Sequence, residues 1–413
     1  MTEIVIVGAG PYGLSIAAHL RGQGISFRIF GRPMDSWLSH MPKGMCLKSE
    51  GFASNLSDPE GNLTLEKFCG ERGIEYAHVH VPVKLDTFTS YGLTFRDRMV
   101  PELEEKLVSH IERTNDGFRL RLEDGEELTA RRIILAVGIT HYEWIPENLA
   151  HLPSEFVSHS FRHADPEKFN GRSVIVVGGG SSATDLVAEL HEHGARVQMV
   201  VRQKEMNFHS TPAIGKKRSL WKRIRHPQSG LGPSMRSAAF CHFPTLFRYL
   251  PASLRMEIVR RHLGPSGTWF TKDRVVGKVQ IQLGSTIEHA EVKNGRVHLR
   301  VRLAEGGTRE FAADHLIAAT GYRVNLDRLK FLSPDLKRQI KDLNRTPVLS
   351  SSYETSVPGL YFVGVSAANS FGPLMRFAFG ADFAARHITS RLVKVMARKP
   401  AVVGAPTAVP TAE

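Results

Sequence analysis

The chain has 413 residues, of which 42% are hydrophobic and 23% are charged, and its formal net charge is +13. This composition is typical of a globular protein and excludes a disordered, collagen-like or coiled-coil chain. The three cysteines, Cys46, Cys69 and Cys241, are too widely spaced for a disulfide scaffold or a CxxC redox or zinc pair. We expect a cytoplasmic protein without a signal peptide, because no basic, apolar leader precedes the first strand and no apolar stretch is long enough to span a bilayer.

Residues 1–30 predict a strand, a glycine turn, a helix and a second strand. Ile4–Val7 is a continuous β-branched run, as in a strand that is buried on both faces. The turn Gly8-Ala9-Gly10-Pro11-Tyr12-Gly13 follows directly, and then an apolar helix at 14–20 and a strand at 26–30. Here Gly8 permits the tight turn, Gly10 lets the backbone approach a pyrophosphate, and Gly13 lets helix and strand pack closely. The free N–H groups at the helix N-terminus would bind the phosphates.

The same pattern recurs 170 residues later, from Gly8 to Gly178. Val174–Val177 leads into Gly178-Gly179-Gly180-Ser181-Ser182-Ala183, and a helix with one apolar stripe follows. Arg196–Val201 is the second strand of this unit. Two such turns in one chain predict two bound dinucleotides.

The residues after the second strand of each unit indicate which dinucleotide it binds. The ribose of NAD or FAD usually meets an acidic residue there, whereas the 2′-phosphate of NADP needs a cation. The second unit has Arg202 and Lys204 and no carboxylate at this place, which predicts NADPH. The first unit has Gly31 followed by Arg32, which disfavours NAD and is compatible with FAD held by the backbone and Arg32.

Residues 202–261 hold thirteen basic residues but only two acidic ones, Glu205 and Glu257. Three interpretations stay open: a solvated basic surface, a site for a phosphate-bearing cofactor or another anion, and a nucleic-acid or lipid surface. Within this segment, Phe240–Leu254 is aromatic and partly basic. That pattern fits core packing or a homodimer contact, a lid over an apolar substrate, or a peripheral membrane contact.

Each unit continues into a predicted β-meander. Residues 117–129 and 295–312 form pairs of short strands that lead into the strands 132–138 and 315–321. The fold class is therefore α/β, with two Rossmann-like dinucleotide-binding domains. We expect the FAD-binding domain at 1–166 and 311–395, and the NADPH-binding domain, with a basic insertion at 203–265, at 167–310. Residues 398–413 are expected to be a disordered tail.

Four motifs are found along the chain: Gly8–Leu14, Asp314 with Ala318–Tyr322, His159-Ser160, and Val357–Gly364. They resemble, in this order, the GxGPxxL motif, the D-x3-[L/F]-ATGY motif, the linker and the strand that returns to the flavin in flavin-containing and N-hydroxylating (ornithine/lysine-type) monooxygenases. These enzymes are flavoproteins with two dinucleotide-binding domains. The chain departs from the pattern at Val365, where many related flavoproteins have Asp, and at Pro153 and Glu155, where the linker motif FxGxxxH has Phe and Gly.

This resemblance covers the chain to about residue 395. It implies that NADPH reduces FAD, that dioxygen adds to form a flavin C4a-hydroperoxide, and that a small substrate is oxygenated, with nitrogen or sulfur favoured. The alternative is an NADPH-dependent flavoprotein reductase that passes electrons to a quinone or a protein. A redox-sensing or nucleic-acid-binding flavoprotein is a third alternative, and the least favoured one.

The resemblance also implies a flavin-facing loop at 36–59. Lys48 falls near the position at which related enzymes place an Asn beside the flavin, Asn55 is the alternative donor, and Trp37 is expected to pack near the isoalloxazine. Lys48 and Asn55 are the first two catalytic candidates.

A second group of site residues follows Gly364. Asn369 and Ser370 are expected to contact the pyrimidine side of the flavin, and Arg376, the third catalytic candidate, to face the pocket. No metal site is expected, because the histidines lack ligand spacing. The remaining cofactor-binding candidates lie in the turns and at strand ends: Pro11, Gly138, Gly178, Gly180, Ser181, Ser182, Gly321 and Gly364.

Overall fold

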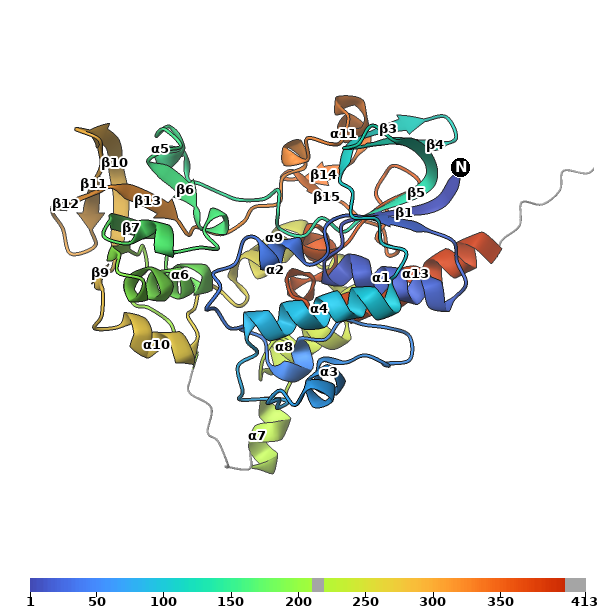
Figure 1. Ribbon diagram of the computed structural model, residues 1–413, viewed down its shortest axis with the longest axis horizontal. Coiled ribbons are helices and arrows are strands. Elements are labelled where there is room, and N and C mark those ends of the chain that lie inside the picture. The colour runs from blue at the N-terminus through green and yellow to red at the C-terminus, as the bar shows by residue number, and fades with distance from the viewer. Residues whose placement is uncertain (210–218, 398–413) are drawn as a thin grey trace, which may run out of the picture.

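The computed structural model describes residues 1–209 and 219–397, and it contains two units that are each built on a separate sheet (Figure 1). The first sheet has the order β2-β1-β5-β4-β3, and β16 also pairs with β5. β1, β2, β5 and β16 are parallel, whereas β3, β4 and β5 form an antiparallel meander. These strands are β1 (Thr2–Val7), β2 (Arg28–Phe30), β3 (Val108–Thr114), β4 (Gly117–Leu122), β5 (Glu127–Leu135) and β16 (Leu360–Phe362).

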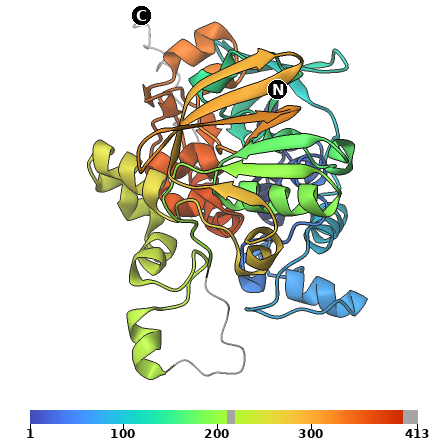
Figure 2. The same ribbon diagram turned by 90° about the vertical axis from the view of Figure 1, so that its left-hand side faces the viewer.

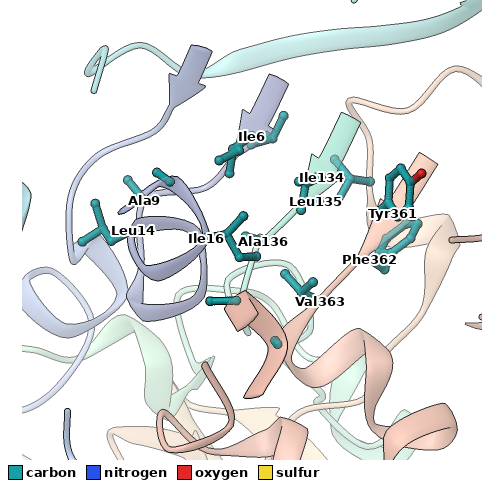
Figure 3. Packing of buried hydrophobic residues seen from close by; sticks show 14 of the residues in the cluster. Ile6, Ala9, Leu14, Ile16, Ile134, Leu135, Ala136, Tyr361, Phe362 and Val363 are labelled. Atoms are coloured by element: carbon teal, nitrogen blue, oxygen red, sulfur yellow. The ribbon is translucent and has the colours of Figure 1, made fainter. Parts of the chain in front are cut away.

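Helices enclose the core of the first unit. Figure 3 shows Ile6, Ile134 and Phe362 of three strands on the side of α1 that carries Ile16, and all four side chains are fully buried. Burial of each such side chain contributes about 1.5–3 kcal/mol, so this core fixes the strand that leads into the first glycine turn. The helices of the unit are α1 (Pro11–Gly22), α2 (Asp35–Leu38), α3 (Leu65–Arg72), α4 (Leu85–Met99), α11 (Pro334–Gln339), α12 (Ala368–Phe371) and α13 (Gly380–Ala397).

The second sheet is entirely parallel, with the order β6-β13-β7-β8-β9. α6 and α10 pack together beside it, and a separate antiparallel sheet, β10-β11-β12, forms the second meander. The elements are β6 (Val157–His159), β7 (Ser173–Val177), β8 (Arg196–Val200), β9 (Gln280–Gln282), β10 (Ser285–Lys293), β11 (Arg296–Leu303), β12 (Thr308–Ala313), β13 (His315–Ala318), α5 (Glu147–Ala150), α6 (Ser181–Glu192) and α10 (Trp269–Val275).

The predicted fold class, with two βαβ units and a meander in each, is confirmed. The expected division at residues 310 and 311 is wrong, because β13 hydrogen bonds to β6 and β7 and so belongs to the second sheet. The division at 166 and 167 is wrong for the same reason, since β6 precedes it. The chain therefore returns to the first unit only after β13. It first forms the small hairpin of β14 (Asp342–Leu343) and β15 (Thr346–Pro347), and then β16.

The predicted basic insertion lies between β8 and α10. Its described part consists of α7 (Leu220–Arg225), α8 (Met235–His242), the 3-10 helix η4 (Pro244–Tyr249) and α9 (Ala252–Arg261). α12 packs on η4 and α9. The insertion therefore contacts the first unit, although in the chain it lies between two elements of the second unit. The expected tail at 398–413 lies outside the described residues. Among the residues that are described, no helix is both long and apolar enough to cross a membrane.

Candidate active site

The first glycine turn leaves the N-terminus of α1 open. Gly8 has a φ of +113°, and a Cβ on it would lie 2.4 Å from the carbonyl oxygen of Ala136. A Cβ on Gly13 would lie 1.8 Å from the carbonyl oxygen of Gly8, so α1 packs directly on the turn. In contrast, no atom of the described chain lies within 4 Å of a Cβ built on Gly10. Since Pro11 stands at N1 and no side chain of the described residues caps the helix, its first N–H groups are free to bind a phosphate.

The second glycine turn repeats this geometry beneath a covering loop. Gly178 has a φ of +143°, and a Cβ on it would lie 2.3 Å from the carbonyl oxygen of Ala319. Gly180 is the N-cap of α6, and a Cβ there would lie 3.5 Å from the Cβ of Pro265. Ser181 donates its hydroxyl to the carbonyl oxygen of Ser266 at 2.9 Å, while Ser182 is exposed in the same first turn. The loop 265–267 therefore borders the N-terminus of α6.

Lys48 connects the flavin-facing loop to this second turn. Its Nζ donates to the carbonyl oxygen of Ser266 at 3.1 Å, and the same oxygen accepts the hydroxyl of Ser181. Burial lowers the pKa of the Lys48 ammonium, and the nearby carboxyl of Asp185 opposes that effect. The structure thus places Lys48 in hydrogen-bond contact with the loop that borders the second turn.

Asp185 is a site residue that the sequence analysis missed. It lies on α6, one helical turn after Ser181, and is 5% exposed. Its Oδ1 has no hydrogen-bond partner within residues 1–209 and 219–397. Burial raises the pKa of Asp185 to about 7, although Arg274 and Lys48 act in the opposite direction. Its position one helical turn after the glycine turn could have indicated a site residue. In the sequence alone, however, an aspartate at that position fits an exposed helix face equally well.

The other two catalytic candidates have structural contacts. Asn55 donates from Nδ2 to the carbonyl oxygen of Phe52 at 3.1 Å and accepts the Leu65 N–H at 2.7 Å, at the start of α3. These contacts support a loop-shaping role for Asn55 rather than the expected donor role. Arg376 is exposed, and its Nη1 donates to the carbonyl oxygens of Val259 and His262 at the end of α9. The positive charge of Arg376 also lowers the pKa of Lys48.

The aromatic and polar candidates around the flavin loop pack against the first unit. Trp37 contacts Phe88 edge to face, with ring centroids 4.9 Å apart. Ser370 is buried, and its Oγ accepts the Leu349 N–H at 3.4 Å. Asn369 is half-buried, and its carbonyl oxygen accepts Nη1 of Arg255. These contacts fix the segment that follows Gly364 but do not direct Ser370 into an open site.

Three strand-end turns complete the cofactor candidates. Gly138 and Gly364 have φ values of +58° and +67°, and a Cβ on Gly364 would lie 3.6 Å from the Tyr12 ring. Gly321, at +83°, accepts hydrogen bonds from the Trp144 N–H and from Nε2 of His159. Because Nδ1 of His159 accepts the Phe161 N–H, its Nε2 carries the proton. His159, the histidine of the linker motif, therefore holds the Gly321 turn in place.

Two arginines, Arg202 and Arg323, follow strands of the second sheet at its carboxyl edge. Arg202 and Lys204 are exposed after β8, as Arg32 is after β2. Burial lowers the pKa of Arg323, and the charge of Arg202 lowers it further. The Arg323 guanidinium stacks over Trp144, 3.4 Å from the ring centroid. The sequence analysis missed Arg323, although it directly follows the Gly321-Tyr322 motif.

A surface pocket of about 630 Å³ lies between the insertion and α13. Phe52 of the flavin-facing loop contributes to its wall, together with Phe379 and Phe383 at the start of α13. Cys241 and Ser229 of the insertion face it from the other side. This volume is within the range of small-molecule sites, and its aromatic walls favour an apolar group.

Comparison with known proteins agrees with this arrangement. A family model described as pyridine nucleotide-disulphide oxidoreductase matches residues 5–228. Indole-3-pyruvate monooxygenase YUCCA1 of Oryza sativa subsp. japonica is 26% identical, over 89% of this chain and 87% of its own. Ferredoxin–NADP reductase of Thermus thermophilus is 27% identical, over 50% of this chain and 55% of its own. The solved structure of ornithine N-hydroxylase from Kutzneria sp. 744, with reduced FAD, NADP⁺ and L-ornithine, has a TM-score of 0.74 at 17% identity and covers 96% of this chain and 100% of its own.

Proposed function

Because the chain belongs to the pyridine nucleotide-disulphide oxidoreductase family, we propose that it is an FAD- and NADPH-dependent monooxygenase. FAD binds at the β1–α1 turn and NADPH at the β7–α6 turn. Dioxygen is the co-substrate, and a small molecule is oxygenated at nitrogen or sulfur. The monooxygenase YUCCA1, which aligns with most of this chain, supports the reaction class. The fold shared with the ornithine N-hydroxylase supports nitrogen as the oxygenated atom.

The observation that carries this proposal is the bridge from Lys48 to Ser181 through the carbonyl oxygen of Ser266. It joins the loop beside the first dinucleotide turn to the helix end of the second. Transfer of a hydride between two dinucleotides requires that both be held at a fixed separation with water excluded. A half-buried lysine at the junction meets this requirement, and it also supplies a cation there.

The residues of the chain fit both cofactors. The uncapped N-terminus of α1 and the empty space above Gly10 provide room and N–H donors for the FAD pyrophosphate. Arg202 and the stacked Arg323 would hold the 2′-phosphate of NADPH by charge-assisted hydrogen bonds. FAD held there would supply the redox chemistry that connects NADPH to dioxygen. The protein orients the two cofactors and keeps water out.

The cysteines argue against disulfide reduction, the reaction after which the family is described. Cys46, Cys69 and Cys241 are all free thiols, and the sequence has no CxxC pair. Burial raises the pKa of each of these thiols, so none is activated as a thiolate. The reductase alternative that remains is electron transfer to a quinone or a protein acceptor, which the similarity to ferredoxin–NADP reductase favours.

Isotopic oxygen transfer distinguishes the two functions. The purified flavoprotein is mixed with NADPH and heavy-isotope dioxygen, with L-ornithine as the amine probe and methyl phenyl sulfide as the sulfide probe. A monooxygenase places one labelled oxygen in an N-hydroxylated amine or a sulfoxide, which mass spectrometry detects. If neither probe is labelled and oxidised ferredoxin or a soluble quinone is reduced faster than dioxygen, the protein is a reductase.

A further inference from the structure

The outer face of α8 and η4 is apolar although solvent surrounds it. Met235, Phe243, Leu246 and Tyr249 are 61%, 60%, 59% and 78% exposed. Inward-facing residues of the same stretch, such as Phe247, are buried against the first unit. Both faces of this part of the insertion are therefore apolar, and the inner one alone accounts for its attachment to the protein.

α7 adds a second exposed apolar group. Trp221 and Ile224, three positions apart on the helix, are 64% and 60% exposed. Both views show α7 extending away from the body of the molecule (Figures 1 and 2). In Figure 2, the helices of residues 219–261, coloured yellow-green to yellow, lie along one side of the molecule. The two apolar groups thus belong to the same side.

The charged residues of α7, α8 and η4 are all basic. The sequence from 206 to 256 contains no Asp or Glu. Arg223, Arg225, Arg236 and Arg248 lie among the exposed apolar side chains, and in the described part of the chain none of the four pairs with a carboxylate. Two of the arginines lie over neighbouring rings, with Arg225 5.0 Å from the Trp221 centroid and Arg248 5.8 Å from that of Tyr249.

Together these ten residues form what we call the basic-apolar surface: Trp221, Arg223, Ile224, Arg225, Met235, Arg236, Phe243, Leu246, Arg248 and Tyr249. We propose that this surface binds the anionic face of a lipid bilayer. Indole and phenol rings favour the boundary between headgroups and acyl chains, and aliphatic side chains enter the acyl region. Guanidinium groups bind lipid phosphates, and an anionic leaflet attracts them further. The contact is peripheral.

Other occupants fit this surface less well. A two-fold contact between two copies would bring the same arginines together, with no carboxylate of the surface to compensate them. Nucleic acid would satisfy the arginines, but it offers no apolar partner for the aliphatic side chains of Ile224, Met235 and Leu246. An anionic bilayer supplies partners for both kinds of side chain at once.

Sedimentation with lipid vesicles tests this proposal on the whole flavoprotein. The probes are vesicles of phosphatidylcholine alone and vesicles with about 30% phosphatidylglycerol. We expect binding to the anionic vesicles that exceeds binding to the neutral ones by about tenfold and weakens as salt is raised. The variant F243S/L246S/Y249S should lose about tenfold in affinity, and R223Q/R225Q/R248Q should lose its preference for the anionic lipid.

A control variant replaces three exposed apolar residues that lie outside this surface. Leu107, Val348 and Val395 are 40%, 42% and 48% exposed, and L107S/V348S/V395S should bind vesicles as the wild type does. Thermal melting shows that each variant is folded. The proposal is overturned if anionic vesicles bind no better than neutral ones, or if the control variant loses as much affinity as F243S/L246S/Y249S. It is also overturned if light scattering shows that F243S/L246S/Y249S turns a wild-type dimer into a monomer, or if a short DNA duplex binds more tightly than the vesicles do.

Discussion

We expect the choice of coenzyme to depend on the exposed Arg202 and on its neighbour Arg323, which stacks on Trp144. Arg202 has no ring or carboxylate partner in the described residues, so a phosphate would be its first strong contact, whereas Arg323 is already oriented by Trp144. We expect Arg202→Ala to raise the KM for NADPH by about tenfold or more and to leave the KM for NADH within about twofold. Steady-state reduction of a dye measures both. Equal losses with both coenzymes would show that Arg202 only supports the fold.

Lys48 is expected to protect the oxygen reaction rather than the binding of coenzyme alone. If its ammonium holds the loop at Ser266 and supplies a cation at the junction, Lys48→Ala should let water enter and release more of the consumed oxygen as hydrogen peroxide. We expect the peroxide yield per NADPH to rise severalfold while NADPH is still oxidised. Lys43→Ala, an exposed lysine of the same loop, is the matched control. An unchanged yield in Lys48→Ala would remove Lys48 from the site.

The titration of Asp185 gives a prediction for protein stability. Its pKa is about 7 in the folded protein and about 3.9 in an unfolded chain. Between these values the native state holds a proton that the unfolded state has lost, so the free energy of unfolding falls as pH rises from about 4 to about 7, and it is level above that. The total effect is on the order of 4 kcal/mol.

Asp185→Asn should therefore flatten the pH dependence of stability. Urea unfolding at several pH values across this window measures the slope for the wild type and the variant. Asp116→Asn, in the exposed turn between β3 and β4, is the control that should keep the wild-type slope. Identical slopes in wild type and Asp185→Asn would mean that Asp185 titrates normally.

At the scale of an element, two glycines of the first turn are expected to have different roles, although they belong to one sequence motif. Gly10 leaves room for the cofactor, and Gly13 allows close packing of α1. Gly10→Ala adds a methyl group where no described atom lies within 4 Å, and the φ of Gly10 is −85°, so the apoprotein should keep its melting temperature. Gly13→Ala places a methyl group 1.8 Å from a backbone oxygen and should destabilise the apoprotein by about 1–3 kcal/mol.

Retention of FAD tests the other half of this prediction. The Gly10 variant should release FAD on dilution, because its methyl group occupies the place of the pyrophosphate. Gel filtration with absorbance detection measures the flavin that remains bound, and calorimetry of the apoprotein measures stability. If Gly10→Ala keeps its FAD as the wild type does, the pyrophosphate does not lie above Gly10.

The β-branched runs and glycine turns made the two sheets predictable, because burial on both faces and positive φ leave few alternatives at Ile4–Val7 and Gly8. Contacts between distant segments were not predictable. Lys48 meets Ser266 across 218 positions, and neither residue type carries a signal for the other. The domain boundary was wrong for a related reason. The apolar run at His315–Ala318 fits a buried parallel strand in either sheet, and only the pairing with β6 and β7 decides between them.

At the scale of the whole molecule, the position of β13 predicts which fragment of the chain can fold. Residues 167–310 lack both β6 and β13, so β7 would lose a neighbour and become an edge strand. Residues 145–325 contain all five strands of the second sheet. We expect cooperative thermal unfolding for 145–325 and none for 167–310, with circular dichroism as the measurement. Cooperative unfolding of the shorter fragment would show that β13 is dispensable.

The placement of β13 and β16 also determines the order in which a nascent chain can complete its sheets. β7 emerges from the ribosome long before β13, its neighbour in the sheet, and β5 emerges even longer before β16. Until then, both sheets expose apolar strand edges that can pair with other chains. Neither sheet can be completed during most of synthesis, so the growing chain carries these unpaired edges until β13 and then β16 emerge.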